Sequence, residues 1–314
     1  MQIQENVSLK EKNWFRTGGN ARYYCEPDSK ADLKEALDFA RTKQVDVFLL
    51  GEGANILVSD SGFDGLVLGT QALTKIEILT HQDGVSKISV EAGAKVQDVI
   101  DYCLDHNLTG LEDFSGIPGT IGGSAYINIH YFDKLLSDFV DSAVVMNKIS
   151  GDMDEVSKDW FEYGYDTSKL MQEMHVLYSI VLKVTKSDDI ATAYARGRRD
   201  EIVRQRNMKY PVKNTCGSFF RNFLEDEVGF ETNGRRILNV AYYLDKIGVK
   251  GDLRVGSALV SYKHANMIET EDGAISDDVI QLARKMQELV KAKYNIIPQP
   301  ECRLIGFEQY PLLS

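Results

Sequence analysis

A run of glycine residues near the middle of the chain is the sequence feature that most directly indicates chemistry. Gly116-Ile-Pro-Gly-Thr-Ile-Gly-Gly123 is followed by Ser124-Ala-Tyr-Ile-Asn128. Glycine permits a positive φ and leaves amide N–H groups unshielded, so such a run suits a cradle for a phosphate-bearing cofactor. The run lacks the Gly-Lys-Ser/Thr of a P-loop and the spacing of the dinucleotide-binding Gly-x-Gly-x-x-Gly, so neither of these motifs applies.

A second glycine-rich stretch runs from Gly51 to Gly65 and reads Gly-Glu-Gly-Ala-Asn-Ile-Leu-Val-Ser-Asp-Ser-Gly-Phe-Asp-Gly. Both stretches follow helix or strand candidates, where loops can gather at one edge of a fold. A set of tight turns is the ordinary explanation for one such loop. Two of them together favour a binding site.

Composition limits the class of protein. The chain has 314 residues, of which 43% are hydrophobic and 26% charged, as is ordinary for a folded protein with a substantial core. A net charge of −11 argues against a nucleic-acid surface but leaves room for a local basic pocket. The scattered Cys25, Cys103, Cys216 and Cys302 form no Cys-x-x-Cys pair, so we expect reduced thiols and no metal site.

Targeting signals are not evident in the sequence. The N-terminus lacks the pattern of a signal peptide, and no apolar run approaches the roughly 18 residues that indicate a membrane span. We therefore expect a cytoplasmic protein without membrane insertion.

The elements that must position the glycine stretches fall into three regions, residues 1–72, 73–186 and 187–314. The first two regions contain a helix from Ser29 to about Lys43 that begins with the cap signal Ser29-x-x-Asp32, strands at Val45–Leu50, Lys75–Leu79 and Lys87–Glu91, a helix from Val96 to about His106, and strands at Phe139–Met146 and Val176–Val184. The third contains an arginine-rich helix from near Ser187, a short strand around Phe219, and helices at Arg236–Lys246 and Ser276–Tyr294. The pattern indicates an α+β protein.

The two glycine stretches resemble the FAD-binding loops of the UDP-N-acetylenolpyruvoylglucosamine reductases, also called UDP-N-acetylmuramate dehydrogenases. Four further segments match that family in order, so that the resemblance covers most of the chain. They are Arg16-Thr-Gly-Gly19, Gly217-Ser-Phe-Phe-Arg-Asn222, Leu253-Arg-Val-Gly256 with Lys263-His-Ala-Asn266, and Pro300-Glu-Cys-Arg303. No insertion follows the Tyr165 region, so the chain resembles the shorter form of the family.

The resemblance implies the fold and the cofactor. It implies two N-terminal α+β subdomains of the vanillyl-alcohol-oxidase type that hold FAD, residues 1–72 and 73–186, followed by a substrate-binding domain, residues 187–314. Backbone amides of the two loops would bind the pyrophosphate. The implied cofactor-binding residues are Gly51, Gly53, Ala54, Asn55, Ile56, Leu57, Gly116, Ile117, Pro118, Gly119, Thr120, Gly122, Gly123, Ser124 and Asn128. Family members commonly have serine where Ala54 stands.

The resemblance also implies the chemistry. In the family, NADPH reduces the flavin, and reduced flavin passes a hydride to the enolpyruvyl group of the sugar nucleotide. The reaction then needs a proton and stabilisation of negative charge. Ser218 occupies the proton-donor position and Glu301 the other acidic catalytic position. From the residues alone, Ser218 would be read as a turn serine and Glu301 as a solvated acid.

Substrate binding is implied for Arg221 and Asn222, with Arg221 suited to a diphosphate, and for Lys263, His264 and Tyr165. A surface salt bridge is the ordinary alternative for Arg221. For a lone histidine such as His264, a structural role is the ordinary one. Core packing is the default reading for Tyr165.

The sequence departs from the family at two places. Tyr165-Asp166-Thr167-Ser168 has an acid where the family usually has an active-site arginine. Asn128-Ile-His-Tyr-Phe-Asp133 has bulky groups where the family tends to have small ones. A carboxylate opposes developing negative charge, and a protonated His130 would restore part of the lost positive charge.

These departures leave three hypotheses open. The first is an NADPH-dependent reductase that forms UDP-N-acetylmuramate for peptidoglycan, favoured by Ser218 and Glu301. The second is a flavin oxidoreductase of the same fold that acts on another substrate, favoured by Asp166 and by His130-Tyr131. The third is an FAD-binding protein without turnover, which retention of Ser218 and Glu301 disfavours.

Overall fold

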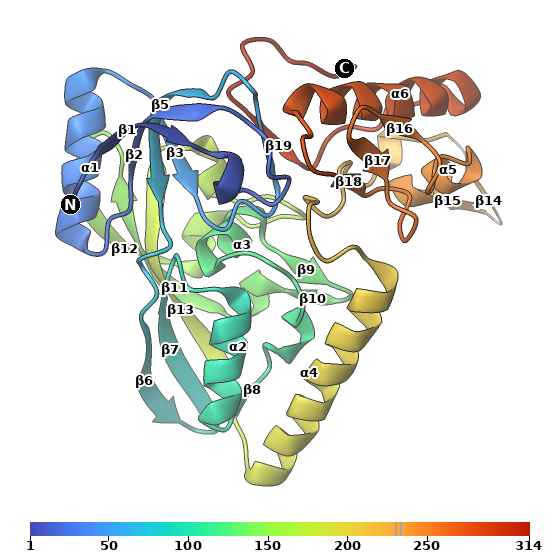
Figure 1. Ribbon diagram of the computed structural model, residues 1–314. Coiled ribbons are helices and arrows are strands. Elements are labelled where there is room, and N and C mark those ends of the chain that lie inside the picture. The colour runs from blue at the N-terminus through green and yellow to red at the C-terminus, as the bar shows by residue number, and fades with distance from the viewer. Residues whose placement is uncertain (230, 233) are drawn as a thin grey trace. The chain divides into compact units, whose positions relative to one another are not determined.

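The computed structural model describes residues 1–229, 231–232 and 234–314, in which α-helices are separated by runs of β-strands (Figure 1). The helices are α1 (Lys30–Lys43), α2 (Val96–Asp105), α3 (Ile121–Ile127), α4 (Asp189–Lys209), α5 (Val240–Lys246) and α6 (Ser276–Tyr294). The strands are β1 (Gln4–Ser8), β2 (Asn20–Cys25), β3 (Val47–Leu50), β4 (Ile56–Val58), β5 (Phe63–Gly69), β6 (Ile76–Gln82), β7 (Val85–Glu91), β8 (Leu108–Thr109), β9 (His130–Tyr131), β10 (Lys134–Leu135), β11 (Val140–Asn147), β12 (Met153–Ser157), β13 (His175–Lys186), β14 (Glu231–Thr232), β15 (Arg235–Arg236), β16 (Arg254–Val255), β17 (Ala258–Val260), β18 (Ile268–Thr270) and β19 (Arg303–Ile305).

The chain crosses repeatedly between two units. Unit 1 comprises Met1–Glu5, Tyr23–Glu52 and Gly65–Arg206, and unit 2 comprises Asn6–Arg22, Gly53–Asp64 and Asn207–Ser314. The Gly51–Gly65 stretch is therefore divided, with Gly51 in unit 1 and Gly53 in unit 2. The three-part division at residues 72 and 186, which assigns roles to the regions, stays a prediction.

The main sheet of unit 1 has the order β12-β11-β13-β7-β6, with β8 also paired to β13. Alternating residues of β7, such as Ile88 and Val90, are buried, as expected for a strand with one face in the core. They share a hydrophobic cluster with Val99 and Cys103 of α2. This cluster fixes α2 on the sheet, immediately before the central glycine run.

Local sequence signals account for the other helix of the first region. The Ser29 hydroxyl accepts a hydrogen bond from the Asp32 amide at 3.2 Å, so the predicted cap begins α1. Leu33 and Leu37 of α1 then pack with Leu66 and Leu68 of β5 in a second cluster of unit 1.

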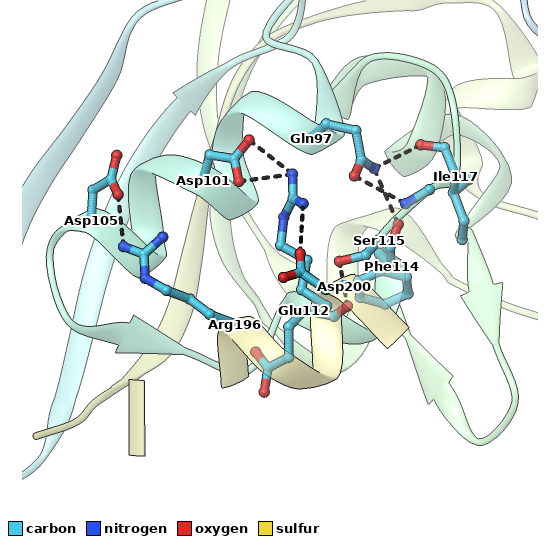
Figure 2. Close-up of polar contacts among 11 residues, drawn as sticks. Gln97, Asp101, Asp105, Glu112, Phe114, Ser115, Ile117, Arg196 and Asp200 are labelled. Carbon is cyan, nitrogen blue, oxygen red and sulfur yellow. Dashed lines mark hydrogen bonds and ion pairs between the residues drawn. The ribbon is translucent and has the colours of Figure 1, made fainter. Parts of the chain in front are cut away.

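Three arginines of α4 contact α2 or the turn before the glycine run. Arg196 pairs with Asp105 at 2.7 Å and Arg199 with Asp101 at 2.8 Å, both across to α2 (Figure 2). Arg198 donates to Asp113 from both Nε and Nη2. The arginine-rich pattern thus serves to hold this helix on unit 1.

Unit 2 is built around α6, whose predicted bounds are confirmed. Its apolar stripe, including Leu282 and Met286, packs with Phe219 and Tyr243 in one cluster. The start of α6 is capped by Asp60, whose carboxylate accepts the Ser276 amide at 3.0 Å and the Asp277 amide at 3.3 Å.

Three local expectations were wrong. Around Phe219 the structure has only the isolated bridges Ser218↔Met267 and Phe220↔Pro300, because side-chain and loop contacts interrupt the pairing. The helix expected from Arg236 begins at Val240, because Arg236 instead pairs in β15 with β14. The glycine run is not wholly a loop, since Thr120 accepts the Gly123 amide at 3.2 Å and so begins α3.

Across the part of the chain that the structure describes, no helix is both long enough and apolar enough to cross a membrane.

Candidate active site

The central glycine run of unit 1 is held from outside by one side chain of α2. Gln97 accepts the Gly116 amide at 3.0 Å and donates to the carbonyls of Ile117 and Phe114 at 3.0 and 3.3 Å (Figure 2). Pro118 follows, and Gly119 has a φ of +118°, which only glycine adopts readily. The loop is thus fixed before α3 begins.

Several amides expected to cradle a phosphate already have partners in the protein. The Ile121 and Gly122 amides donate to the carbonyls of Ala94 and Ala92 at 2.8 and 2.7 Å. The Gly119 amide donates to the Glu52 carboxylate at 2.8 Å, and the other oxygen of Glu52 lies 3.1 Å from Lys95. The Gly119 amide therefore already donates to an anionic oxygen, which is the kind of acceptor that a phosphate group offers.

The glycines of unit 1 differ in whether a side chain would fit at their position. A Cβ on Gly51 would lie 2.6 Å from Thr120 Oγ1, and one on Gly122 would lie 2.9 Å from the Ala92 carbonyl oxygen. A Cβ on Gly119 would meet nothing within 4 Å, and one on the exposed Gly123 only Thr120 Oγ1 at 3.6 Å. Packing inside the protein therefore explains Gly51 and Gly122. Gly119 and Gly123 leave an open face that suits a closely approaching ligand.

The part of the Gly51–Gly65 stretch that was predicted to bind the cofactor, Gly53–Leu57, lies in unit 2. Gly53 has a φ of +65°, and a Cβ there would lie 2.5 Å from the Lys12 carbonyl oxygen. Ala54 follows, half-buried, and Ile56 and Leu57 are buried in β4. Asn55 Oδ1 is buried, yet accepts no hydrogen bond from the described residues. A buried oxygen without a donor is costly, so this atom fits a ligand N–H or O–H.

Unit 2 brings the two predicted catalytic residues onto neighbouring segments. The Phe219 carbonyl accepts the Glu301 amide at 2.9 Å, and the Arg221 amide donates to the Gln299 carbonyl at 2.9 Å. Ser218 and Glu301 are both half-buried. Segment 218–221 therefore lies directly beside segment 299–302.

The opposite edge of the Ser218 segment is held by Asn266. The Asn266 carbonyl accepts the Phe219 amide at 2.8 Å. Its side chain accepts the Phe220 amide at 3.1 Å and donates to the Phe220 carbonyl at 2.7 Å. On the far side, β19 pairs in parallel with β4, so that Arg303 lies opposite Ile56. Four of the matched sequence segments thus meet in unit 2.

Four predicted substrate-binding residues of unit 2 have partners within the protein. Arg221 makes a two-pronged ion pair with Glu227 at 2.8 and 2.6 Å, which raises the pKa of Arg221 and lowers that of Glu227. Asn222 accepts the Val240 amide at 3.3 Å. Lys263 donates to the Asn207 carbonyl at 2.7 Å. His264 Nδ1 accepts the Asn266 amide at 3.3 Å, and burial lowers the pKa of His264.

The fifth predicted substrate residue, Tyr165, lies in unit 1 beside both sequence departures. Its hydroxyl lies 3.2 Å from His130 Nε2, and His130 Nδ1 lies 3.1 Å from Asp166. Asn128, predicted to bind the cofactor, donates to the Gly164 carbonyl at 2.9 Å and accepts the Ser137 amide at 3.0 Å. Ser124 is buried and accepts the Ile129 amide through its carbonyl at 2.9 Å.

Sequence reasoning did not single out Glu52 and Gln97. Glu52 lies within the Gly51–Gly65 stretch, in which the glycines were interpreted as the functional residues. Gln97 is a half-buried polar residue in the first turn of the helix that leads to the glycine run, and this position is the signal that could have found it.

Sulfur and metal chemistry add little to this site. The four cysteines are buried free thiols, and burial raises the pKa of Cys216 well above its ordinary value. Within residues 1–229, 231–232 and 234–314, His, Cys, Asp and Glu form no group of three or more that could hold a metal ion.

The chain is similar to two described protein families along successive segments. Residues 21–156 match the FAD binding domain family, and residues 208–305 match the C-terminal domain of UDP-N-acetylenolpyruvoylglucosamine reductase. A solved UDP-N-acetylenolpyruvylglucosamine reductase from Thermus caldophilus has the same fold, with a TM-score of 0.77 at 23% identity over 98% of this chain and all of its own. The predicted fold class is therefore confirmed: an α+β protein with an FAD-binding fold of the vanillyl-alcohol-oxidase type and a C-terminal α+β domain.

Curated relatives named UDP-N-acetylenolpyruvoylglucosamine reductase match nearly the whole chain. One from Synechococcus is 29% identical over 99% of this chain and 94% of its own length. One from Clostridium botulinum (strain Eklund 17B / Type B) is 31% identical over 97% of this chain and 93% of its own length. Since both ends and both matched domains are included, the chain belongs to the UDP-N-acetylenolpyruvoylglucosamine reductase family.

Proposed function

We propose that the protein reduces UDP-N-acetylglucosamine enolpyruvate to UDP-N-acetylmuramate, with NADPH as the reductant and FAD as its cofactor, in the synthesis of peptidoglycan precursors. The names of relatives that match along nearly the whole chain support this proposal. We also propose a cytoplasmic location, which the sequence pattern favours.

One observation carries the proposal. Segment 218–221 is hydrogen-bonded on one edge to Asn266 and on the other to residues 299–302, so that Ser218 and Glu301 are held by the same backbone network. These residues come from three matched motifs that are far apart in the sequence. The reaction requires a proton donor and an acid close together, and this network supplies both.

Each residue has a defined task in the proposed reaction. Bound FAD supplies hydride chemistry, which NADPH replenishes. The Ser218 hydroxyl donates the proton that completes reduction of the enolpyruvyl group, because a strongly basic, carbanion-like centre can take a proton even from an alcohol. Glu301 orients Ser218 or the substrate, and the backbone pairing at Phe219 keeps the two residues in register.

The residues present fit FAD by two independent observations. Asn55 Oδ1 is buried and has no donor among the described residues, so it can accept from a polar group of the cofactor. Gly119 and Gly123 leave open space where a Cβ would stand, and the Gly119 amide already binds a carboxylate oxygen. We propose that the Gly119 region holds the pyrophosphate after Glu52 moves aside.

Two of the proposed substrate-binding residues must first give up partners within the protein. Arg221 can bind the diphosphate of the substrate only if Glu227 shares or releases its guanidinium. Lys263 must likewise leave the Asn207 carbonyl. We propose that residues 187–314 bind the substrate, and that residues 1–72 and 73–186 hold FAD.

The test is to separate the two half-reactions. Anaerobic NADPH should reduce the bound flavin, and subsequent addition of the enolpyruvyl sugar nucleotide should reoxidise it rapidly. Failure of reoxidation with intact reduction by NADPH would refute the proposed substrate.

That outcome would favour a second candidate, an FAD-dependent oxidoreductase acting on another substrate. The ion pair between His130 and Asp166 is the observation that favours it, because these are the residues at which the sequence departs from the family.

A further inference from the structure

Tyr165, His130 and Asp166 form a continuous chain of polar contacts in unit 1. Asp166 Oδ1 lies 3.1 Å from His130 Nδ1, and His130 Nε2 lies 3.2 Å from the Tyr165 hydroxyl. The two rings lie 4.7 Å apart. The side chains of Asp166 and His130 are 21% and 32% exposed, whereas Tyr165 is 58% exposed. The chain therefore runs from a sheltered carboxylate to an accessible phenol.

The backbone holds this chain of residues against the end of α3. The Asn128 side chain donates to the Gly164 carbonyl at 2.9 Å, and the Ser168 hydroxyl donates to the Tyr126 carbonyl at 2.6 Å. These contacts fix both ends of the turn that carries Tyr165 and Asp166. Asp166 itself has a φ of +53°, a left-handed conformation that costs free energy and recurs at functional sites. The turn is thus anchored to the helix that the glycine run begins.

The protonation state of His130 sets the direction of the hydrogen bond between its Nε2 and the Tyr165 hydroxyl. The Asp166 carboxylate, 3.1 Å from Nδ1, favours a proton on that nitrogen and so the tautomer with a lone pair on Nε2. The Tyr165 O–H then donates a hydrogen bond to Nε2, and the lone pairs of the Tyr165 oxygen face outward. When His130 is protonated, Nε2–H donates to the Tyr165 oxygen, and the phenolic O–H turns outward as a donor.

We propose that Tyr165, His130 and Asp166 form a protonation-gated binding site for an anionic oxygen of the ligand, either carboxylate or phosphate. When His130 is protonated, the site offers the Tyr165 O–H as a donor beside the imidazolium of His130, whose charge Asp166 balances. When His130 is neutral, the site presents the lone pairs of the Tyr165 oxygen and the uncompensated charge of Asp166 to the same ligand. The substrate identity rests on the proposed function, because UDP-N-acetylglucosamine enolpyruvate carries both kinds of anionic oxygen.

Other charged groups on the elements packed around His130 modulate this site. Lys134 lies on the paired strand β10, and Asp133 lies in the intervening turn. The remaining ones are Glu112 and Asp113 on the turn beside β9, Asp138 after β10, Lys169 after Asp166, and Arg206, whose guanidinium lies 5.3 Å from the Tyr131 ring centre. Asp113 and Lys169 are paired with Arg198 and Glu162, whereas Asp166 and Tyr165 contact His130 directly.

The test is an NMR titration of the FAD-loaded, full-length protein labelled at histidine, with UDP-N-acetylglucosamine or its enolpyruvyl derivative at saturation. The chain has five histidines, so His130→Gln assigns the signal. Preference of the ligand for the protonated site must raise the pKa of His130 on binding, by about one unit for a tenfold preference. A rise with both compounds identifies the diphosphate, and a rise with the enolpyruvyl compound alone identifies the carboxylate.

Variants separate binding from structure. Tyr165→Phe should abolish the ligand-induced rise while His130 still pairs with Asp166, and Asp166→Asn should lower the pKa of His130 without ligand. His106→Gln is the matched control, since His106 also stacks on a tyrosine, Tyr102, at 4.2 Å.

Flavin absorbance reports ligand binding separately at each pH. A ligand that binds while the pKa of His130 stays unchanged overturns the inference and leaves the proposed function standing. If neither ligand binds, the proposed function fails, and an unaltered His130 titration in Asp166→Asn then also overturns the triad.

Discussion

Replacing Gly123 by alanine tests whether the glycine run exists for a ligand or for packing. Gly123 is exposed in the first turn of α3, and an added Cβ would meet only Thr120 Oγ1 at 3.6 Å, an ordinary contact. Nothing in the described part of unit 1 therefore requires glycine at this position. Alanine should raise the free energy of unfolding of the FAD-free protein by about 0.5 kcal/mol, because it restricts the unfolded chain and favours the helix.

The same methyl group should weaken FAD binding. If the pyrophosphate lies against this turn, an extra carbon in the contact costs about 1–3 kcal/mol, as overpacking does in protein interiors. This corresponds to a loss of affinity of roughly five- to 150-fold, since about 1.4 kcal/mol changes a binding constant tenfold. FAD titration followed by flavin fluorescence measures the affinity, and urea unfolding of the FAD-free protein measures the stability.

The adjacent Gly122 provides the matched control. Its added Cβ would lie 2.9 Å from the Ala92 carbonyl oxygen and 3.0 Å from Ala92 Cβ, so Gly122→Ala should destabilise the FAD-free protein by about 1–3 kcal/mol. Unchanged FAD affinity in Gly123→Ala would refute the assignment of this turn to the cofactor. A Gly123→Ala protein less stable than the wild type would show that the glycine has an internal role.

Three further changes probe other parts of the molecule. Ser218→Ala should slow flavin reoxidation by the sugar nucleotide by orders of magnitude while sparing reduction by NADPH in stopped-flow absorbance; equal rates in both half-reactions would remove Ser218 as the proton donor. Asp60→Ala should lower the free energy of unfolding by about 1 kcal/mol, since its carboxylate caps α6; a matching loss in Asp64→Ala, whose side chain is 87% exposed, would argue against capping. The pKa of Asp141 is lowered from 3.8, first by its hydrogen bond from Lys87, so its stabilisation is present above that value and is lost as the pH falls through the lowered one. Acid urea unfolding should therefore show a shallower loss of stability in Asp141→Asn than in the wild type, and parallel curves would contradict this.

Elements defined by local signals could be predicted from the sequence. The cap at Ser29 and the amphipathic stripe of α6 involve residues within a few positions of one another, and both are found in the structure. The start of α3 was missed because its first turn contains Gly122 and Gly123, which disfavour helix, while the Thr120 cap that outweighs them is a single residue.

Long-range pairings could not be predicted from periodicity. The backbone network joining Ser218 to Asn266 and Glu301 links loops with little regular structure, and only the family resemblance pointed to those residues. The sequence showed both His130 and Asp166 as departures, with His130 as a source of positive charge, but not that the two are in contact. Such a contact depends on how Asn128 and Ser168 position the turn, which no local pattern encodes.

The parallel pairing of β4 with β19 has a consequence for how the protein is made. Ile56 lies opposite Arg303, so β4 meets this partner only after residues 59–302 have been synthesised. Unit 2 therefore cannot complete its core during synthesis, whereas the main sheet of unit 1, β6 to β13, ends at Lys186. Contacts this distant in sequence form late and expose unpaired strands meanwhile. During that interval the edge of β4 that pairs with β19 has no such partner.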